Sequence, residues 1–132
     1  MKIFLDTNVL ISAVATRGLC ADVMREVLTS HELVVCEALI SELKRNLKSK
    51  IKLSNELIEE FTAMLQSDSV FVKPESSITI NGIDKNDCAI LSCAIQGDAQ
   101  LFVTGDRELL NLQKVEQLII ISPREFWERS KK

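Results

Sequence analysis

The feature that most constrains this chain is a short apolar run near its start that ends on an acid. Ile3, Phe4 and Leu5 are followed directly by Asp6, and Asn8 opens a second apolar run with helical spacing. An uninterrupted apolar run of this kind is typical of a strand buried on both faces of a parallel sheet. Asp6 is therefore expected where a central strand ends and a helix begins. In open α/β sheets this carboxyl edge is where ligands bind.

Taken alone, Asp6 also has a simple structural interpretation. A carboxylate at this point can cap the helix, because its oxygens accept hydrogen bonds from the unpaired N–H groups of the first turn. The functional interpretation therefore depends on whether other acids reach the same edge.

The rest of the chain alternates predicted strands and helices and contains no repeats. Further apolar runs predict strands at 33–36, 70–72, 101–104 and 118–121, and the polar stretch 76–82 predicts a loop. Five short strands separated by helices predict a three-layer α/β/α sandwich with a central parallel sheet of about five strands. The length of 132 residues suits a single domain spanning 1–132. Helical spacing and capping residues predict helices at 8–15, 20–29, 37–47, 54–66, 88–95, from 106 and from 123.

Composition excludes several classes of protein. No segment approaches the roughly 18 apolar residues of a membrane span, and Asp6 interrupts the run that could begin a signal peptide. The four cysteines form no C-x-x-C pair and the chain has one His, which argues against a zinc site. We therefore expect reduced, buried thiols in a cytoplasmic protein without membrane association.

Several acids are predicted at or near one edge of the sheet. Asp6 and Asp106 each follow a predicted strand, Asp87 lies in the first turn of a largely apolar helix, and Glu42 lies on the helix 37–47. Each acid alone is also explained as a helix cap or a solvated residue. Together they would repel one another, and a divalent cation would remove that cost. Oxygen ligands without His or Cys favour a hard ion, Mg²⁺ or Mn²⁺.

These motifs, taken in order, resemble a PIN domain. They are Asp6-Thr7-Asn8 after an apolar strand, an acid on the third helix, Asp87 heading an apolar helix, and Val103-Thr104-Gly105-Asp106. The resemblance covers nearly the whole chain. Matched residue by residue, the resemblance places the family's catalytic, metal-binding acids on Asp6, Glu42, Asp87 and Asp106. It places the polar residues that support these acids on Asn8 and Thr104.

The resemblance is closest to PIN proteins assigned as toxins of toxin–antitoxin modules. Many of these have Asp-Pro-Asp-Asp before the buried helix, whereas this chain has Asp84-Lys85-Asn86-Asp87. The outer acids remain, so we assign the site acid to Asp87 and a supporting role to Asp84. On the third helix, Glu37 is a nearby alternative to Glu42.

The resemblance implies an activity, cofactors and partners. Family members are typically metal-dependent ribonucleases, so we expect a Mg²⁺- or Mn²⁺-dependent endoribonuclease that hydrolyses RNA phosphodiester bonds. It also implies a cognate antitoxin and a homodimer. The alternative is a catalytically inactive PIN-like domain that binds RNA or protein.

The net charge of −3 does not exclude RNA, because removing the four site acids from the sum leaves +1. A basic cluster follows from the third helix onward, with Lys44, Arg45 and Lys48 as candidate RNA contacts and Lys50 and Lys52 beyond them. Such a cluster can guide an RNA backbone. It is equally explained as a solvated helix end, where cations are favourable.

Overall fold

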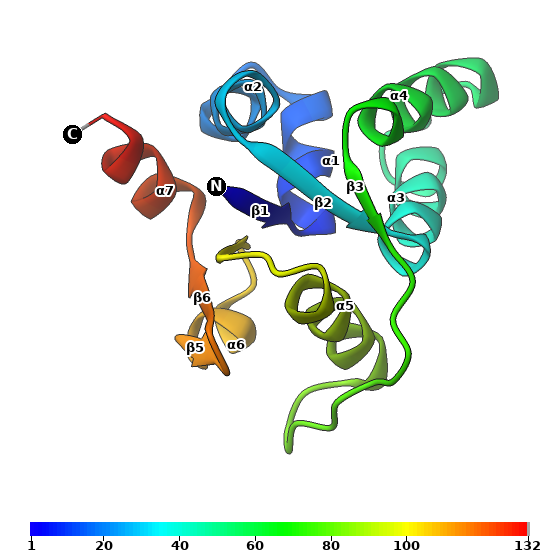
Figure 1. Ribbon diagram of the computed structural model, residues 1–132. Helices are drawn as coiled ribbons and strands as arrows, with labels where there is room; N and C mark the ends of the chain where they lie inside the picture. The colour runs from blue at the N-terminus through cyan, green and yellow to red at the C-terminus, as the bar shows by residue number, and fades with distance from the viewer. Residues whose placement is uncertain (132) are drawn as a thin grey trace.

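A six-stranded sheet lies between helices in the computed structural model, which describes residues 1–131 (Figure 1). The strands are β1 (Lys2–Leu5), β2 (Glu32–Cys36), β3 (Val70–Val72), β4 (Leu101–Val103), β5 (Lys114–Val115) and β6 (Leu118–Ile121). Their order across the sheet is β3-β2-β1-β4-β6-β5. All neighbouring pairs are parallel except β5 and β6. The predicted α/β fold is thereby confirmed.

The helices cover both faces of the sheet because the strand order reverses at β1. From β1 through β2 to β3 the chain adds strands on one side of β1, and from β4 to β6 it adds them on the other side. Right-handed crossovers then place their helices on opposite faces, and Figure 1 shows α1 and α5 on opposite sides of the strands. The helices are α1 (Thr7–Ala15), α2 (Leu19–Ser30), α3 (Glu37–Ser49), α4 (Asn55–Ser67), α5 (Lys85–Gln96), α6 (Arg107–Leu110) and α7 (Pro123–Ser130).

One strand was not predicted. The five predicted strands are all present, but β5 adds a two-residue antiparallel edge strand beside β6. Two residues are too few to show an alternating pattern. The turns that flank β5 place Gln113 and Glu116 at positive φ, at 62° and 54°. Neither is a typical turn residue, so this hairpin leaves little signal in the sequence.

The core is centred on β1, which explains its apolar sequence. Ile3, Phe4 and Leu5 have no exposed surface. Phe4 pairs with Phe102 of β4, and the two rings stack with centroids 5.2 Å apart. Burying each of these large side chains stabilises the fold by roughly 1.5–3 kcal/mol. The strand that Asp6 follows is thus packed on both faces.

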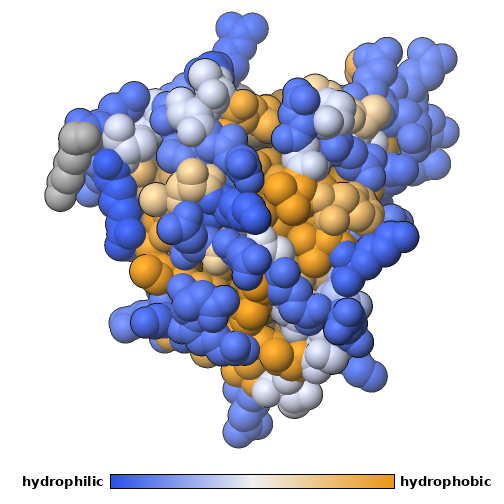
Figure 2. All heavy atoms as spheres, in the orientation of Figure 1, coloured by the Kyte–Doolittle hydropathy of each residue, from blue (hydrophilic) through white to orange (hydrophobic). Residues whose placement is uncertain are grey.

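The surface is mixed in character. Figure 2 shows hydrophilic side chains around the rim of one face and hydrophobic atoms between them in its middle. Exposed large hydrophobic residues include Leu57 and Met64 on α4, Phe71 on β3 and Ile119 on β6. Within residues 1–131, no helix combines the length and the hydropathy needed to cross a membrane.

Candidate functional site

The candidate site lies where β1 and β4 end side by side. These strands are neighbours, while the chain leaves β1 and β4 toward helices on opposite faces. A crevice at such a reversal of strand order is the usual ligand position in open α/β sheets. Asp6 follows β1, and its backbone N–H donates to the carbonyl of Val103 at 2.9 Å. The turn after β1 is therefore tied to the end of β4.

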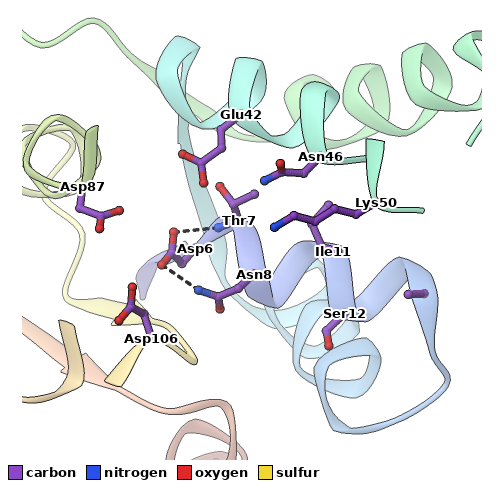
Figure 3. A pocket seen from close by; sticks show the side chains of 11 residues that line it. Asp6, Thr7, Asn8, Ile11, Ser12, Glu42, Asn46, Lys50, Asp87 and Asp106 are labelled. Atoms are coloured by element: carbon purple, nitrogen blue, oxygen red, sulfur yellow. Dashed lines mark hydrogen bonds between the residues drawn. The ribbon is translucent and has the colours of Figure 1, made fainter. Parts of the chain in front are cut away.

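The Asp6 carboxylate is buried and receives hydrogen bonds on both oxygens. Its side chain and backbone together are 4 % exposed. Oδ1 accepts from the backbone N–H of Thr7 at 2.8 Å and Oδ2 accepts from Asn8 Nδ2 at 3.2 Å (Figure 3). Oδ2 also accepts from Thr104 Oγ1 at 2.8 Å. Burial raises the pKa of Asp6, as do the charges of Glu42 and Asp106, while the bonds from Thr104 and Thr7 oppose that rise.

Asn8 and Thr104 join the two turns on either side of Asp6. The Asn8 amide oxygen accepts from the backbone N–H of Gly105 at 2.9 Å, and its Nδ2 also reaches Thr104 Oγ1 at 3.3 Å. The Thr104 hydroxyl additionally accepts from the backbone N–H of Asp106 at 3.0 Å. Because Asn8 faces both a carboxylate and an N–H, only one orientation of its amide satisfies both partners. These two residues fix Asp6 relative to Asp106.

Asp106 comes from the turn after β4 and lies beside Asp6. One of its oxygens, Oδ1, caps α6 by accepting from the backbone N–H of Glu108 at 2.9 Å. Capping uses one lone pair, so the carboxylate keeps acceptor capacity toward the crevice. In Figure 3 it points toward Asp6.

Asp87 reaches the same crevice from the first turn of α5. Asp84 is the N-cap of that helix and accepts from the backbone N–H of Asp87 at 2.8 Å, so Asp87 itself is not needed as the cap. Partial burial raises the pKa of Asp87 to about 6, together with the charges of Asp84, Asp6, Asp106 and Glu42. This carboxylate therefore lies in the field of the other acids.

Glu42 completes the group from α3. It is half-buried and lines the crevice, whereas Glu37 is exposed at the start of the helix and accepts from Ser41 Oγ at 3.2 Å. Asn86 donates from Nδ2 to Glu42 Oε2. The chain therefore has Asn86 where the Asp-Pro-Asp-Asp pattern has its third residue, an acid. The Asn86 amide binds Glu42, whereas a carboxylate at this position would repel it.

The acids line one pocket of about 360 Å³ (Figure 3). Asp6, Glu42, Asp87 and Asp106 come from four separate elements of the fold and face it from different sides. In residues 1–131, no three acidic, His or Cys side chains converge closely enough to coordinate one ion as they are oriented. The pKa of Asp87 nevertheless responds to the other three, so the group acts as one electrostatic unit without forming a closed ligand cage.

Comparison with known proteins agrees with this arrangement. The family model described as "PIN domain" matches residues 2–108. The chain belongs to the PIN-domain family. This confirms the resemblance drawn from the motifs, because the match extends over most of the chain.

Solved structures share the fold of this PIN domain at low sequence identity. A structure of VapBC2 from Rickettsia felis bound to a DNA fragment from their promoter has a TM-score of 0.65 and 17 % identity, covering 92 % of this chain and 98 % of that chain. A structure of VapBC-1 from nontypeable Haemophilus influenzae has a TM-score of 0.65 and 19 % identity, covering 94 % and 99 %. No curated protein matches the chain.

The opposite end of the pocket in this PIN domain was not anticipated from the sequence. Thr7, Asn46 and Lys50 line it. The Thr7 hydroxyl is buried and has no hydrogen-bond partner within the described residues. The motif around Asp6 includes Thr7, but no sequence pattern distinguishes a buried Thr whose hydroxyl lacks a hydrogen-bond partner from one whose hydroxyl has a partner.

The basic residues on α3 and in the turn after it separate into two groups. Lys44 pairs with Glu59 of α4 at 3.3 Å, and Arg45 and Lys48 are exposed and do not line the pocket. Only Lys50 of this cluster lines it, among the residues that the structure describes.

Proposed function

We propose that this PIN domain is a metal-dependent endoribonuclease that hydrolyses RNA phosphodiester bonds. The observation that carries the proposal is the group of four carboxylates from separate elements around one pocket. Their mutual repulsion contributes to an Asp87 pKa of about 6. Bringing these like charges together lowers the stability of the fold. A functional requirement for the carboxylates explains why the protein keeps them.

The donor set fits a hard divalent cation. Asp6, Glu42, Asp87 and Asp106 offer carboxylate oxygens, and no His or Cys lines the pocket. Oxygen donors of this kind suit Mg²⁺ or Mn²⁺. When bound, such an ion would offset the acids, polarise the phosphate and acidify water.

The chain's own residues would orient the reaction. Asn8 and Thr104 hold the Asp6 carboxylate in one orientation, because each donates a hydrogen bond to its Oδ2 and a third bond joins the two residues to each other. In hydrolysis, a water oxygen bonds to phosphorus, the P–O bond to the leaving ribose breaks, and the leaving oxygen receives a proton. No side chain is required as a covalent nucleophile.

One observation favours a second candidate, a catalytically inactive PIN-like domain that binds RNA or protein. In the described residues no three acids are oriented to coordinate one ion together. A metal titration followed by calorimetry separates the two, because the inactive domain would bind Mn²⁺ no more tightly than a scattered set of surface acids.

We also propose that the protein is the toxin of a type II toxin–antitoxin module, acting in the cytoplasm as a homodimer. Two lines support this proposal: the motif resemblance to PIN toxins, and the VapBC origin of the two structures of similar fold. The expected partner is an antitoxin that presents a basic side chain to the acidic pocket. Co-expression with the product of a neighbouring small gene, followed by co-purification, tests this partner.

The direct test of the proposed activity is RNA cleavage in Mn²⁺ and in Mg²⁺, with EDTA as the control. Asp6→Asn and Asp106→Asn should each abolish metal-dependent cleavage because each removes a charged oxygen ligand. Circular dichroism should show an intact fold, since both side chains keep nearly the same volume. Cleavage at the parental rate by both variants would show that these acids are not the site.

A further inference from the structure

The pocket that holds the acids has a second end with the opposite character. Lys50 is the only cation that lines it in residues 1–131, and Asn46 and Thr7 line the pocket near it (Figure 3). In Figure 3 the Lys50 side chain runs from the end of α3 into the pocket, with its ammonium group toward Thr7. One wall is therefore anionic and the other offers donors.

The Thr7 hydroxyl is the most informative group at this end. Thr7 is 2 % exposed, and its Oγ1 has no hydrogen-bond partner within the described residues. Its backbone N–H is already used by Asp6, so the residue is fixed in place. A buried hydroxyl without a partner is costly, because folding removes its hydrogen bonds to water and replaces them with none. Its position on the pocket wall points to a ligand atom as the missing partner.

Lys50 is held at the pocket by its backbone while its charge stays uncommitted. Its N–H donates to the carbonyl of Asn46 at 2.9 Å, and the following turn is closed by the Leu53 N–H on the carbonyl of Leu47 at 3.1 Å. Leu47 is fully buried, which anchors this turn to the core. Within residues 1–131, Lys50 makes no ion pair, in contrast to Lys44 with Glu59.

We infer that Lys50, Asn46 and Thr7 form a subsite for a phosphodiester group of the RNA chain next to the one that is cleaved. One ammonium, one amide and one hydroxyl match the single charge and the acceptor oxygens of a phosphodiester. The acids occupy the other end of the same pocket, so the RNA strand would run from the cleaved bond along α1 toward the end of α3. This inference rests on the proposed function and specifies how its substrate is held.

The test measures binding directly, with a fluorescein-labelled single-stranded oligoribonucleotide followed by anisotropy, in EDTA and again in Ca²⁺. Lys50→Met should weaken binding about tenfold, the loss of one charge-assisted hydrogen bond. Lys73→Met is the matched control, because it removes the same charge from an exposed side chain outside the pocket. It should change the dissociation constant less than twofold. Equal losses in both variants would overturn the subsite.

Neutral linkages locate the contact. A set of oligonucleotides carries one methylphosphonate each, scanned along the chain. The loss caused by Lys50→Met should vanish with one particular neutral linkage, which is the signature of a direct pair in a double-mutant cycle. That linkage should neighbour the bond that is cleaved in Mn²⁺. A loss that persists at every linkage, or that vanishes only at the cleaved bond, would overturn the inference.

Thr7→Val separates binding from a structural role. Valine keeps the shape and removes a hydroxyl that has no partner in the fold, so the melting temperature should not fall. Binding of the oligonucleotide should weaken about fivefold, as for a neutral hydrogen bond. A lower melting temperature with unchanged binding would show that the hydroxyl serves the fold and would overturn its place in the subsite.

The outcomes also distinguish this inference from the proposed function. Cleavage in Mn²⁺ without coupling to Lys50 overturns the subsite alone. Coupled binding without cleavage overturns the proposed nuclease activity and leaves a phosphate-binding groove. Absence of RNA binding by the parent in both EDTA and Ca²⁺ overturns the subsite, and cleavage then reports separately on the nuclease.

Discussion

Replacing Asp87 with Asn should stabilise the metal-free protein at neutral pH. The pKa of Asp87 is raised from 3.8 to about 6 by partial burial and by Asp84, Asp6, Asp106 and Glu42. When the pKa of a carboxyl group is higher in the folded than in the unfolded state, ionising that group lowers the free energy of unfolding. The Asn side chain keeps the shape and removes the charge, and the helix cap is unaffected because Asp84 provides it.

The magnitude follows from the raised pKa and from the exposure of the side chain. A rise from 3.8 to about 6 corresponds to at most about 3 kcal/mol at neutral pH. Asp87 is only partly buried, so solvent screening reduces this to about 1 kcal/mol. For a chain of this size, that free energy raises the melting temperature by about 3–5 °C.

The pH dependence has a definite sign. Below about pH 4 Asp87 is protonated in both the folded and the unfolded state, so the parent and the variant should differ little. As pH rises toward about 6, the unfolded state ionises first and the parent loses stability. The advantage of Asp87→Asn should therefore grow between about pH 4 and pH 6 and level off above that.

Thermal melts in EDTA from acidic to neutral pH measure this difference, and a second series with millimolar Mn²⁺ adds the ligand. Mn²⁺ should raise the melting temperature of the parent with concentration and affect Asp87→Asn much less. Glu116→Gln is the control, since it removes one charge from an exposed turn remote from the pocket. If Asp87→Asn melts lower than the parent in EDTA at neutral pH, the repulsion argument is refuted.

Three further predictions concern packing and assembly. Thr104→Val should lower the free energy of unfolding by about 1–3 kcal/mol in denaturant melts, because the buried Asp6 carboxylate loses one of its hydrogen-bond donors and the Asp106 N–H loses its acceptor; an unchanged midpoint would contradict this. Gly97→Ala should destabilise by about 1–3 kcal/mol in the same assay, because an added Cβ would lie 2.6 Å from Val72 Cγ2 and 2.7 Å from Val34 Cγ1, whereas Gly18→Ala meets only ordinary contacts and should be tolerated. Light scattering at high micromolar concentration should give the mass of a dimer, and a monomer would exclude the proposed homodimer.

The order of the elements and the placement of three acids followed from the sequence. The apolar runs gave the five main strands, and Asp6 and Asp106 were expected at the carboxyl edge because each directly follows a strand. That expectation does not depend on the strand order, since parallel strands share one carboxyl edge in any arrangement. Asp87 followed from its position at the head of a buried helix, and Ser54 and Ser122 cap helices as their positions indicate.

Other features depend on how the elements pack, which local patterns do not encode. Glu42 and Glu37 lie on the same helix, and only the rotation of α3 against its neighbours decides which one faces the pocket. The bond from Asn86 to Glu42 joins residues 44 positions apart. Strand β5 exists because β6 offers an edge to pair with.

The end of the pocket lined by Thr7, Asn46 and Lys50 shows most clearly which features the sequence predicts and which depend on packing. The sequence predicts RNA contacts at Lys44, Arg45 and Lys48 within a basic cluster that extends to Lys52, but charge and helical spacing are alike along this cluster and give no physical ground for preferring any member. Tertiary structure commits Lys44 to Glu59 and turns Lys50 into the pocket. It also leaves the Thr7 hydroxyl buried without a partner. Burial and pairing are properties of the assembled fold, so the sequence determined which chemical groups this protein has, and the tertiary structure decided which of them meet.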